Sequence, residues 1–369
     1  GRYAALAALA VVLLQDVFWV STKIEVYALH LLLVLAAYWI MYDDTLDVGP
    51  SARVLLLGIF TGLGAATHQI TFIVLFPLYL LMLRELGWTI LLAVPGFGLG
   101  IFSCYPAIVN TIASGDDVFR LLRVFLTGSD GMSASGWEGS LFRFDRMARD
   151  KNSVILVLVS LVGIGLLGLL GRPRGTKVRV LWWAATLDLL FSVSFGINDR
   201  FTFFLPGAAF YAILGLTVVH RRYAEAAIAR YAMLGLILAH PLLMVGAYEL
   251  ADAGVIKMPK HRAALPYRDD IKYYLSPYLP DKSAERFVME YERYVPEGSV
   301  VLSDFTPWAA LRAAQVTGRF GSRVLQQCDQ TDEAWPRTMY LVRREYCEQY
   351  LAGYSIEAAP LGWVASKDG

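Results

Sequence analysis

Residues 54–83 read VLLLGIFTGLGAATHQITFIVLFPLYLLML and contain no Asp, Glu, Lys or Arg. A helix crosses the ~30 Å hydrocarbon core of a bilayer with ~20 apolar residues, and ~17 suffice. The stretch is too long for a single span, and His68 and Gln69 divide it into apolar runs at 52–68 and 70–84. Because lipid offers the backbone no hydrogen-bond partners, each run is predicted to form a helix.

Runs of the same kind fill the chain up to residue 248 and do not recur beyond it. Hydrophobic residues make up 56% of the chain and charged residues only 18%, which is too little polar surface for a soluble protein. The sequence therefore predicts a polytopic α-helical membrane protein with about nine transmembrane helices and a small C-terminal α/β domain. The nine runs cover residues 3–20, 24–41, 52–68, 70–84, 89–109, 153–171, 179–196, 202–219 and 231–248.

The polar tail has the sequence pattern of an α/β domain. Short strand-like runs alternate with helical stretches, and this alternation is typical of a parallel sheet. We therefore predict a transmembrane domain at 1–248, a Pro- and Tyr-rich connector at 249–298 and an α/β domain at 299–369. Within the last, strands are expected at 299–303, 322–327, 338–342 and 355–365, and helices at 307–316 and 344–353.

Two basic turns set the predicted orientation. They lie at 172–179 and 220–230, and exactly one pair of spans separates them, so both face the same side. An excess of Lys and Arg marks cytoplasmic loops. Counting spans from these turns places residues 43–53 and 84–88 inside and the tail outside. The loop at 110–152 also falls outside, and its six basic residues, accompanied by six acidic ones, oppose this assignment.

The spacing of the three cysteines and the absence of common catalytic motifs limit the kinds of site that the chain can contain. Cys104 lies within a predicted span, whereas Cys328 and Cys347 lie in the tail, and their spacing is not that of a metal site. In an oxidising compartment the tail pair would form a disulfide, and the alternative is two buried thiols. No phosphate loop, metalloprotease motif or nucleophile elbow occurs, and no basic tract indicates a nucleic-acid partner. The sequence thus identifies no cofactor and no metal ligands.

Ionisable and polar side chains gather near the predicted outer ends of four spans. Charges next to lipid are costly, so such groups usually face a wet, protein-lined cavity and mark function. The alternative is that each side chain simply reaches the aqueous interface. Asp188 and His240 lie in mid-span, and they are expected to pair with each other or with the backbone. The residues near the outer ends include Asp16, Lys23, Glu25, His30, His68, Asp199 and Arg200.

Several stretches of the chain resemble one family of bacterial membrane proteins. The segment DVFWVSTKIEVYALHLLLVLAAYW at 16–39 is similar to the family's EVYAL segment, and GIFTGLGAATHQITFIVLFP at 58–77 resembles its next span. ASGDDVFRLLRVFLTG at 113–128, residues 199–215 and SVVLSDFTPWAAL at 299–311 are also similar. The family is related to the animal transmembrane protein O-mannosyltransferases and belongs to the GT-C type of glycosyltransferase. EVYAL followed by the downstream His is the specific part of the resemblance.

The resemblance implies a GT-C-like fold in a bacterial inner membrane. It also implies transfer of a mannose-like sugar from a polyprenyl-phosphate donor to a protein or glycan acceptor on the periplasmic side. Glu25, Tyr27, His30 and His68 match motif positions of the family. Members also carry an essential acidic residue in a first outer loop that precedes these motifs. That loop is not part of this sequence, so the principal carboxylate is expected upstream of residue 1, and Asp16 is not its substitute.

Sugar transfer itself requires certain groups. A carboxylate takes the proton of the acceptor hydroxyl, while cations or hydrogen-bond donors stabilise the departing phosphate. We predict Lys23, His68 and Arg200 on the phosphate side, and Glu25 orienting a base or a sugar hydroxyl. Two other hypotheses remain. A transporter or lipid flippase favours inverted repeats, which the sequence does not show, and a non-catalytic scaffold would recruit partners through its tail.

Overall fold

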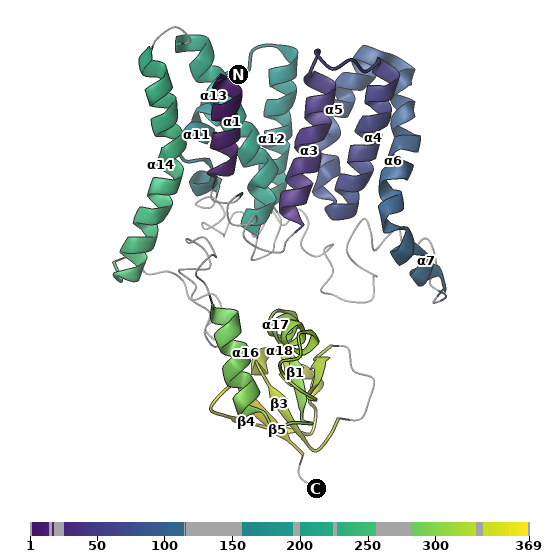
Figure 1. Cartoon of the computed structure of the whole chain (residues 1–369), viewed down its shortest axis with the longest axis vertical. Helices are drawn as coiled ribbons and strands as arrows, with labels where there is room; N and C mark the ends of the chain where they lie inside the picture. Colours follow the sequence, from purple (N-terminus) through teal and green to yellow (C-terminus); the bar gives the residue numbers. More distant parts are fainter. Residues whose placement is uncertain are drawn as a thin grey trace. The chain divides into compact units, whose positions relative to one another are not determined.

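The structure is a computed structural model, and it divides the chain into two compact units, residues 1–245 and 246–369 (Figure 1). The first unit is helical, and the second contains a five-stranded sheet. The structure describes residues 2–14, 17, 26–113, 115, 157–194, 200–223, 227–255, 282–329 and 335–367.

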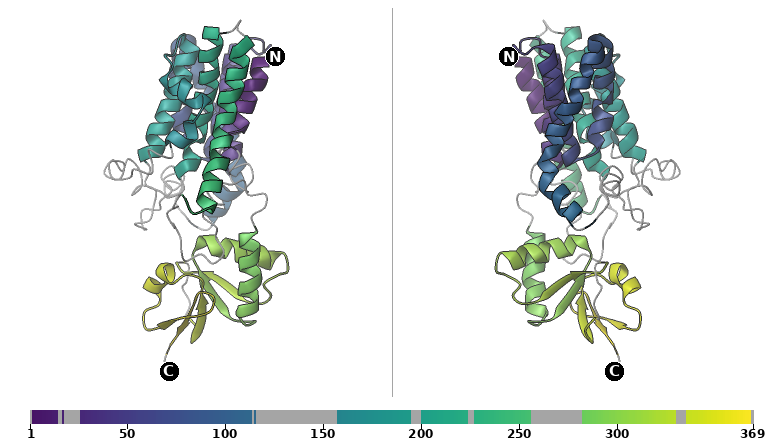
Figure 2. Two further views of the ribbon diagram at one scale, coloured as in Figure 1. Left: turned by 90° about the vertical axis from the view of Figure 1, so that its left-hand side faces the viewer. Right: turned by 90° about the vertical axis from the view of Figure 1, so that its right-hand side faces the viewer.

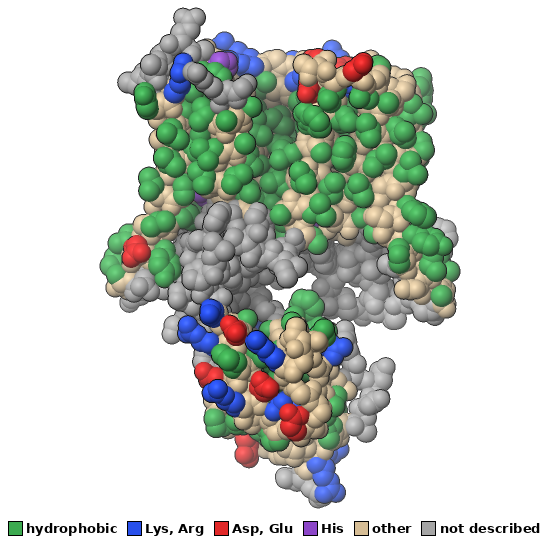
Figure 3. All heavy atoms as spheres, in the orientation of Figure 1, with side chains coloured by type: hydrophobic (Ala, Val, Ile, Leu, Met, Phe, Trp, Pro, Cys, Tyr) green, Lys and Arg blue, Asp and Glu red, His purple; other side chains and the backbone are tan. Residues whose placement is uncertain are grey.

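The helices of the first unit run side by side along a common direction (Figure 2). In the face shown in Figure 3, hydrophobic side chains cover their middle, and most of the charged side chains gather at one end. The α-helices are α1 (Arg2–Val12), α3 (Tyr27–Tyr42), α4 (Pro50–Thr67), α5 (Ile70–Leu86), α6 (Ala93–Ile101), α7 (Tyr105–Ala113), α11 (Ile164–Leu170), α12 (Thr176–Ser194), α13 (Leu205–Tyr223) and α14 (Ala227–Asp252). Short 3₁₀ turns are η1 (Gly87–Leu92), η2 (Phe102–Cys104) and η4 (Arg200–Phe204).

The prediction of a helical membrane protein is confirmed in its coarse form. Within the described ranges, four helical stretches are long and apolar enough to cross a bilayer: Pro50–Thr67, Ile70–Cys104, Thr202–Arg222 and Arg230–Ala251. Tyr3–Val12 and Tyr27–Tyr42 are apolar but shorter. The described residues do not confirm the predicted total of about nine spans, in part because α12 carries Lys177, Arg179 and Asp188.

The predicted span at 153–171 is not one continuous helix. Residues 153–156 lie outside the described part, and the helix that covers 157–161 is separated from α11 by Gly163 at φ +84°. A Cβ at Gly163 would collide with the Leu236 carbonyl oxygen of α14. Glycine therefore permits both the left-handed backbone and the close approach of α14, and the hydrophobic run alone does not reveal this break.

Glycines bring α4 and α6 into backbone contact. A Cβ at Gly62 would lie 2.8 Å from the Ile101 nitrogen, and one at Gly100 would lie 2.8 Å from the Leu63 nitrogen. Gly58 and Gly96 face the partner backbone equally closely, one helical turn away. Small residues at this spacing let membrane helices pack by van der Waals contact, which is the role that the sequence indicates for this glycine-rich stretch. Gly98, in contrast, faces open space.

The junctions predicted to share one side of the membrane do lie together. Tyr42, at the end of α3, donates its hydroxyl to the Lys177 carbonyl at 3.1 Å, and the Lys177 ammonium contacts Asp44 at 3.0 Å. Arg53 donates to the carbonyls of Ile40, Asp43, Leu46 and Val48. The end of the unit that carries these residues is called the basic end below.

The second unit holds a mixed sheet of strand order β2-β1-β3-β5-β4. The central strand β1 pairs in parallel with β2 and with β3, whereas β5 is antiparallel to both β3 and β4. The strands are β1 (Val300–Ser303), β2 (Val324–Gln327), β3 (Thr338–Leu341), β4 (Ser355–Ala358) and β5 (Trp363–Ser366). The prediction of an all-parallel sheet is therefore wrong at this edge. The single strand expected at 355–365 is a hairpin, which turns where Ala359 N–H donates to the Gly362 carbonyl and Gly362 has φ +77°.

Helices cover both faces of the sheet. On one face α16 (Ser283–Tyr294) and α17 (Phe305–Val316) pack Tyr291 and Leu311 against Val301. On the other face, α18 (Arg344–Cys347) and η5 (Glu348–Tyr350) lie near a cluster that contains Leu302 and Met339. The predicted connector at 249–298 thus contains α16, a helix whose apolar side chains belong to the core of the α/β unit.

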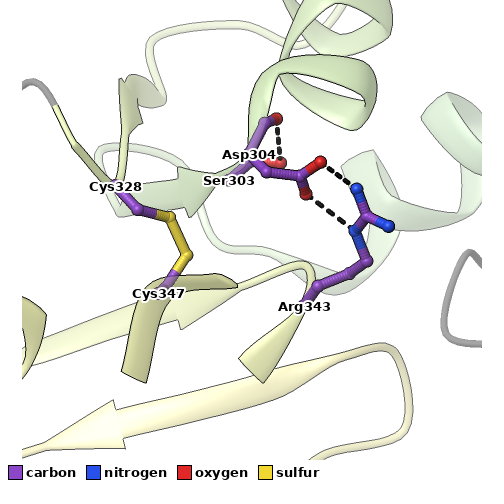
Figure 4. The surroundings of a disulfide bond; sticks show 5 residues. All are labelled: Ser303, Asp304, Cys328, Arg343 and Cys347. Carbon is purple, nitrogen blue, oxygen red and sulfur yellow. Dashed lines mark hydrogen bonds and ion pairs between the residues drawn. A yellow bond between two sulfur atoms is a disulfide. The ribbon is translucent and has the colours of Figure 1, made fainter. Parts of the chain in front are cut away.

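One disulfide and one ion pair connect the residues that follow the parallel strands β1 and β2 to the segment around α18 (Figure 4). Cys328, just after β2, forms a disulfide with Cys347 of α18, which settles the alternative of two free thiols. Asp304, just after β1, accepts hydrogen bonds from the Arg343 guanidinium through both carboxylate oxygens, with Arg343 Nε at 2.7 Å from Asp304 Oδ1. Arg343 is only 1% exposed, so this bidentate pair is what keeps a buried cation compensated.

We predict that Gly62→Ala destabilises the helical unit by about 1–3 kcal/mol, because the new Cβ would push α4 away from α6. Thermal unfolding of the detergent-purified protein measures this change. Gly98→Ala is the matched control in the same helix pair and should cause no loss, since its Cβ would meet no neighbour. Equal losses in the two variants would contradict close packing between α4 and α6.

For the α/β unit we predict that Cys328→Ala with Cys347→Ala lowers the free energy of unfolding by about 3 kcal/mol, the chain-entropy expectation for the loop that the disulfide closes. The native protein should also migrate faster on non-reducing electrophoresis than after reduction, and the double variant should not. Cys104→Ala, which removes the free cysteine of the first unit, is expected to keep the mobility shift. A wild-type protein without this shift would argue against the disulfide.

Candidate functional site

Three of the predicted site residues come together in the helical unit. Tyr27 and His30 lie in the first turn of α3, and His68 follows α4. The ring centroids of His30 and His68 are 5.7 Å apart, and those of Tyr27 and His68 are 5.3 Å apart. Phe203 of η4 closes the group with its ring 4.8 Å from that of His68. We call these four residues, together with Thr71, the histidine cluster.

The α4–α5 turn positions His68. The residue leaves the helix with extended backbone, at φ −163° and ψ 133°, while its N–H still donates to the Gly64 carbonyl at 2.7 Å. Thr71 enters the first turn of α5 beside Gly64, where a Cβ would lie 2.9 Å from the Thr71 hydroxyl. Glycine at position 64 therefore leaves the room in which Thr71 can reach α3.

A chain of hydrogen bonds fixes the hydrogen on His30. The Thr71 hydroxyl donates to the His68 carbonyl at 2.8 Å, so its single hydrogen is used there. The contact of 2.8 Å between His30 Nε2 and Thr71 Oγ1 must then be a donation from the imidazole. We therefore assign the hydrogen of His30 to Nε2, which links α3 to the α4–α5 turn through one hydroxyl group.

The second imidazole is oriented by the backbone. Ile70 N–H donates to His68 Nδ1 at 3.2 Å, so Nδ1 carries no hydrogen and Nε2 is the donor of this ring. His30, His68, Thr71 and Phe203 are all buried, and Tyr27 is half-buried. The His30 Nε2–H is already donated to Thr71, so the cluster presents the His68 Nε2–H and a phenol in largely apolar surroundings, where a hydrogen bond to an incoming oxygen is stronger than in water.

The histidine cluster lies far from the basic end. Tyr42, which contacts Lys177 there, is twelve residues beyond His30 on the same helix, or ~18 Å at the α-helical rise. Arg200 begins η4, the element that supplies Phe203, although the side chain of Arg200 is outside the described part. Lys23, Glu25 and Asp199 also lie outside the described residues, so their predicted roles remain predictions.

The two mid-span polar residues bind backbone groups and not each other. Asp188 Oδ2 accepts a hydrogen bond from Gly207 N–H at 2.7 Å, and His240 hydrogen-bonds the backbone of Val159. Glycine at position 207 permits this hydrogen bond, because the Cβ of any other residue would lie 2.7 Å from Asp188 Oδ2 and would collide with it. Of the two expected arrangements, pairing with the backbone is confirmed, and it ties α12 to α13.

Two members of the histidine cluster were not predicted from the sequence. Thr71 and Phe203 are ordinary residues of apolar helical segments, and neither is ionisable. The spacing of Thr71, three residues after His68 and so on the same side of a helical turn, is the one signal for it. Within the described residues, His, Cys, Asp and Glu form no group of three or more placed to hold a metal ion.

Comparison with known proteins does not assign a function to the chain. No protein-family model, curated protein or solved structure matches the chain.

We predict that Thr71→Val destabilises the helical unit by about 1–3 kcal/mol, because it leaves the buried His30 N–H without its acceptor at almost unchanged side-chain volume. Thermal unfolding in detergent tests this prediction. Thr67→Val is the control, since the Thr67 hydroxyl donates only to the Gly64 carbonyl, which already accepts the His68 N–H. A Thr67 variant as unstable as the Thr71 variant would refute the special role of this hydroxyl.

Proposed function

We propose that the protein is a membrane glycosyltransferase of the GT-C type, transferring a mannose-like sugar from a polyprenyl-phosphate donor to an extracytoplasmic acceptor. The observation that supports it most is the histidine cluster. Tyr27, His30 and His68 match motif positions of the family that the sequence resembles, and α3 and the α4–α5 turn bring them together at one site. η4, which contains Arg200, contributes Phe203 to the same site.

The geometry of the cluster suits the phosphate side of such a reaction. When the sugar leaves its carrier, negative charge grows on the phosphate oxygens, and donors that are already oriented stabilise it without reorganising. His68 is held by the backbone through Nδ1, so its Nε2–H is pre-positioned as one such donor. Arg200 and Lys23 would add cationic charge near it. Glu25 would orient a base or a sugar hydroxyl.

The charge pattern and the disulfide support the proposed orientation in the membrane. The basic end would face the cytoplasm by the positive-inside rule, and the histidine cluster would then be near the periplasmic side of a bacterial inner membrane. Disulfides persist in oxidising compartments, so the bond between Cys328 and Cys347 supports a periplasmic tail. The acceptor, a protein or a glycan, would be met on that side.

One observation favours a second candidate, a transporter or lipid flippase. Transporters use interrupted helices near mid-membrane, and the break at Gly163 before α11 is an interruption of this kind. The break packs against Leu236 of α14 and does not adjoin any residue of the histidine cluster that the structure describes, so we rank it second.

A transfer assay tests the proposal directly. The purified protein is incubated in detergent with radiolabelled polyprenyl-phosphate mannose or glucose and membrane-derived acceptors. His68→Asn should lower transfer by about 10²-fold, the usual cost of one oriented donor, because Asn can replace Nδ1 as acceptor of the Ile70 N–H but does not reach as far as Nε2.

The matched control is His220→Asn. His220 is exposed at the C-terminal end of α13 and contacts Tyr3, with ring centroids 4.1 Å apart and the rings tilted by 53°. This variant should retain wild-type transfer. Folded wild-type protein that neither transfers nor hydrolyses either donor would overturn the proposal and move the weight to transport. Full activity in the His68 variant would remove the histidine cluster from the mechanism.

A further inference from the structure

A groove runs along the outside of the helical unit between α5 and α12, and none of its lining residues belongs to the histidine cluster. Its volume is about 520 Å³. One wall comes from α5 and the other from α12, and most of the lining side chains are apolar. The lining residues are Phe76, Pro77, Leu80, Leu81 and Arg84 of α5, and Thr176, Arg179, Val180, Trp183 and Leu187 of α12.

The two cations of the groove lie at one end of it. Arg84 is in the last turn of α5, and Arg179 is in the first turn of α12, next to the basic turn at 172–179. Both are exposed, and neither guanidinium group has an ion pair or hydrogen bond with another residue in the part of the chain that the structure describes. Lys177, by contrast, is compensated by Asp44.

The nearest acidic residue in sequence does not neutralise this pair. Glu85 follows Arg84 directly, but adjacent residues of a helix point in different directions, and Glu85 is not among the lining residues. The groove therefore ends in two uncompensated guanidinium groups, which suit a phosphate through charge-assisted hydrogen bonds.

The remainder of the groove suits an alkyl chain. Phe76, Leu80 and Trp183 are each about half exposed, as expected for side chains that face lipid in a membrane helix. Phe76 lies two turns before Arg84, so the apolar wall extends ~12 Å from the cations at the α-helical rise. A ligand that fits has a phosphate at one end and a hydrocarbon chain that continues into the bilayer.

We propose that this groove binds one anionic phospholipid of the surrounding bilayer, in the leaflet at the basic end. Its phosphate lies between Arg84 and Arg179, and an acyl chain follows Phe76, Leu80 and Trp183. Basic pockets between membrane helices are a recognised setting for such headgroups. The lipid-linked sugar donor of the proposed function would bind at the histidine cluster, near the other end of the unit, so the two proposals are independent.

Titration of the detergent-purified protein with dioleoyl phosphatidylglycerol tests this inference, with bound lipid counted by native mass spectrometry. We expect one saturable site, with dioleoyl phosphatidylcholine binding at least about tenfold more weakly because its headgroup carries no net charge. Arg84→Gln with Arg179→Gln should weaken phosphatidylglycerol binding by about tenfold or more. Dihexanoyl phosphatidylglycerol, which has the same headgroup, should bind wild type more weakly than the long-chain lipid.

The control removes the same charge at the same end. Arg172→Gln with Arg174→Gln changes two exposed arginines that do not line the groove, and it should leave the affinity unchanged. Equal loss in the two double variants would show diffuse attraction to the basic end and overturn the site. So would full competition by inorganic phosphate, which needs no acyl chain, or tighter binding of a polyprenyl phosphate than of phosphatidylglycerol. Unfolding curves without lipid verify that both variants fold.

Discussion

Hydrocarbon cannot supply hydrogen bonds, and the helical unit is arranged around this constraint. Several polar side chains inside the helical unit therefore bind other groups of the protein. Tyr38 donates to the Val74 carbonyl at 2.9 Å, and the Tyr79 hydroxyl meets that of Thr61 at 2.7 Å. Asp188 likewise accepts from the Gly207 N–H. Polar groups thus join α3 to α5, α4 to α5 and α12 to α13, and they fix neighbours that apolar packing alone would leave free to slide.

Backbone approach is the other half of that constraint. Lipid tails are as apolar as leucine, so burying leucine gives helices no reason to associate, whereas close contact of backbones gains dispersion energy. Gly62 with Gly100 in one pair of helices, and Gly168 with Gly215 in another, provide such contact. The histidine cluster depends on the same device, because Gly64 makes room for Thr71. A site that joins three segments of the chain is therefore built on positions without side chains.

Hydropathy predicts where helices occur in this chain better than how they end. The run at 52–68 corresponds closely to α4, because Pro50 begins the helix and extended backbone at His68 ends it. The run at 153–171 conceals the break at Gly163, since a glycine is equally apolar whether it continues a helix or interrupts it. In the tail, local pattern locates β1 and α17, but the antiparallel β4–β5 pair depends on a turn at Gly362, and the partners of a strand are set by contacts distant in sequence.

Only the ionisable residues of the candidate site could be predicted from the sequence. His30 and His68 stand out because imidazoles are rare in apolar runs, whereas Thr71 and Phe203 have meaning only once α3, α5 and η4 are assembled. The sequence uses Arg179 to set the orientation and only assigns Arg84 to the same side, whereas the structure shows that both line one groove.

The two ends of the helical unit also differ in how they would meet a phosphate. At the basic end the cations are exposed and remain hydrated, so binding there relies on charge and weakens as salt screens it. At the histidine cluster the imidazole donor is the buried Nε2–H of His68, which was desolvated when the protein folded. A phosphate that entered this site would meet a donor that need not shed water or reorient. That difference favours holding a lipid at the basic end and stabilising a developing charge at the histidine cluster, because pre-oriented donors in an apolar setting act most strongly on charge that appears during reaction.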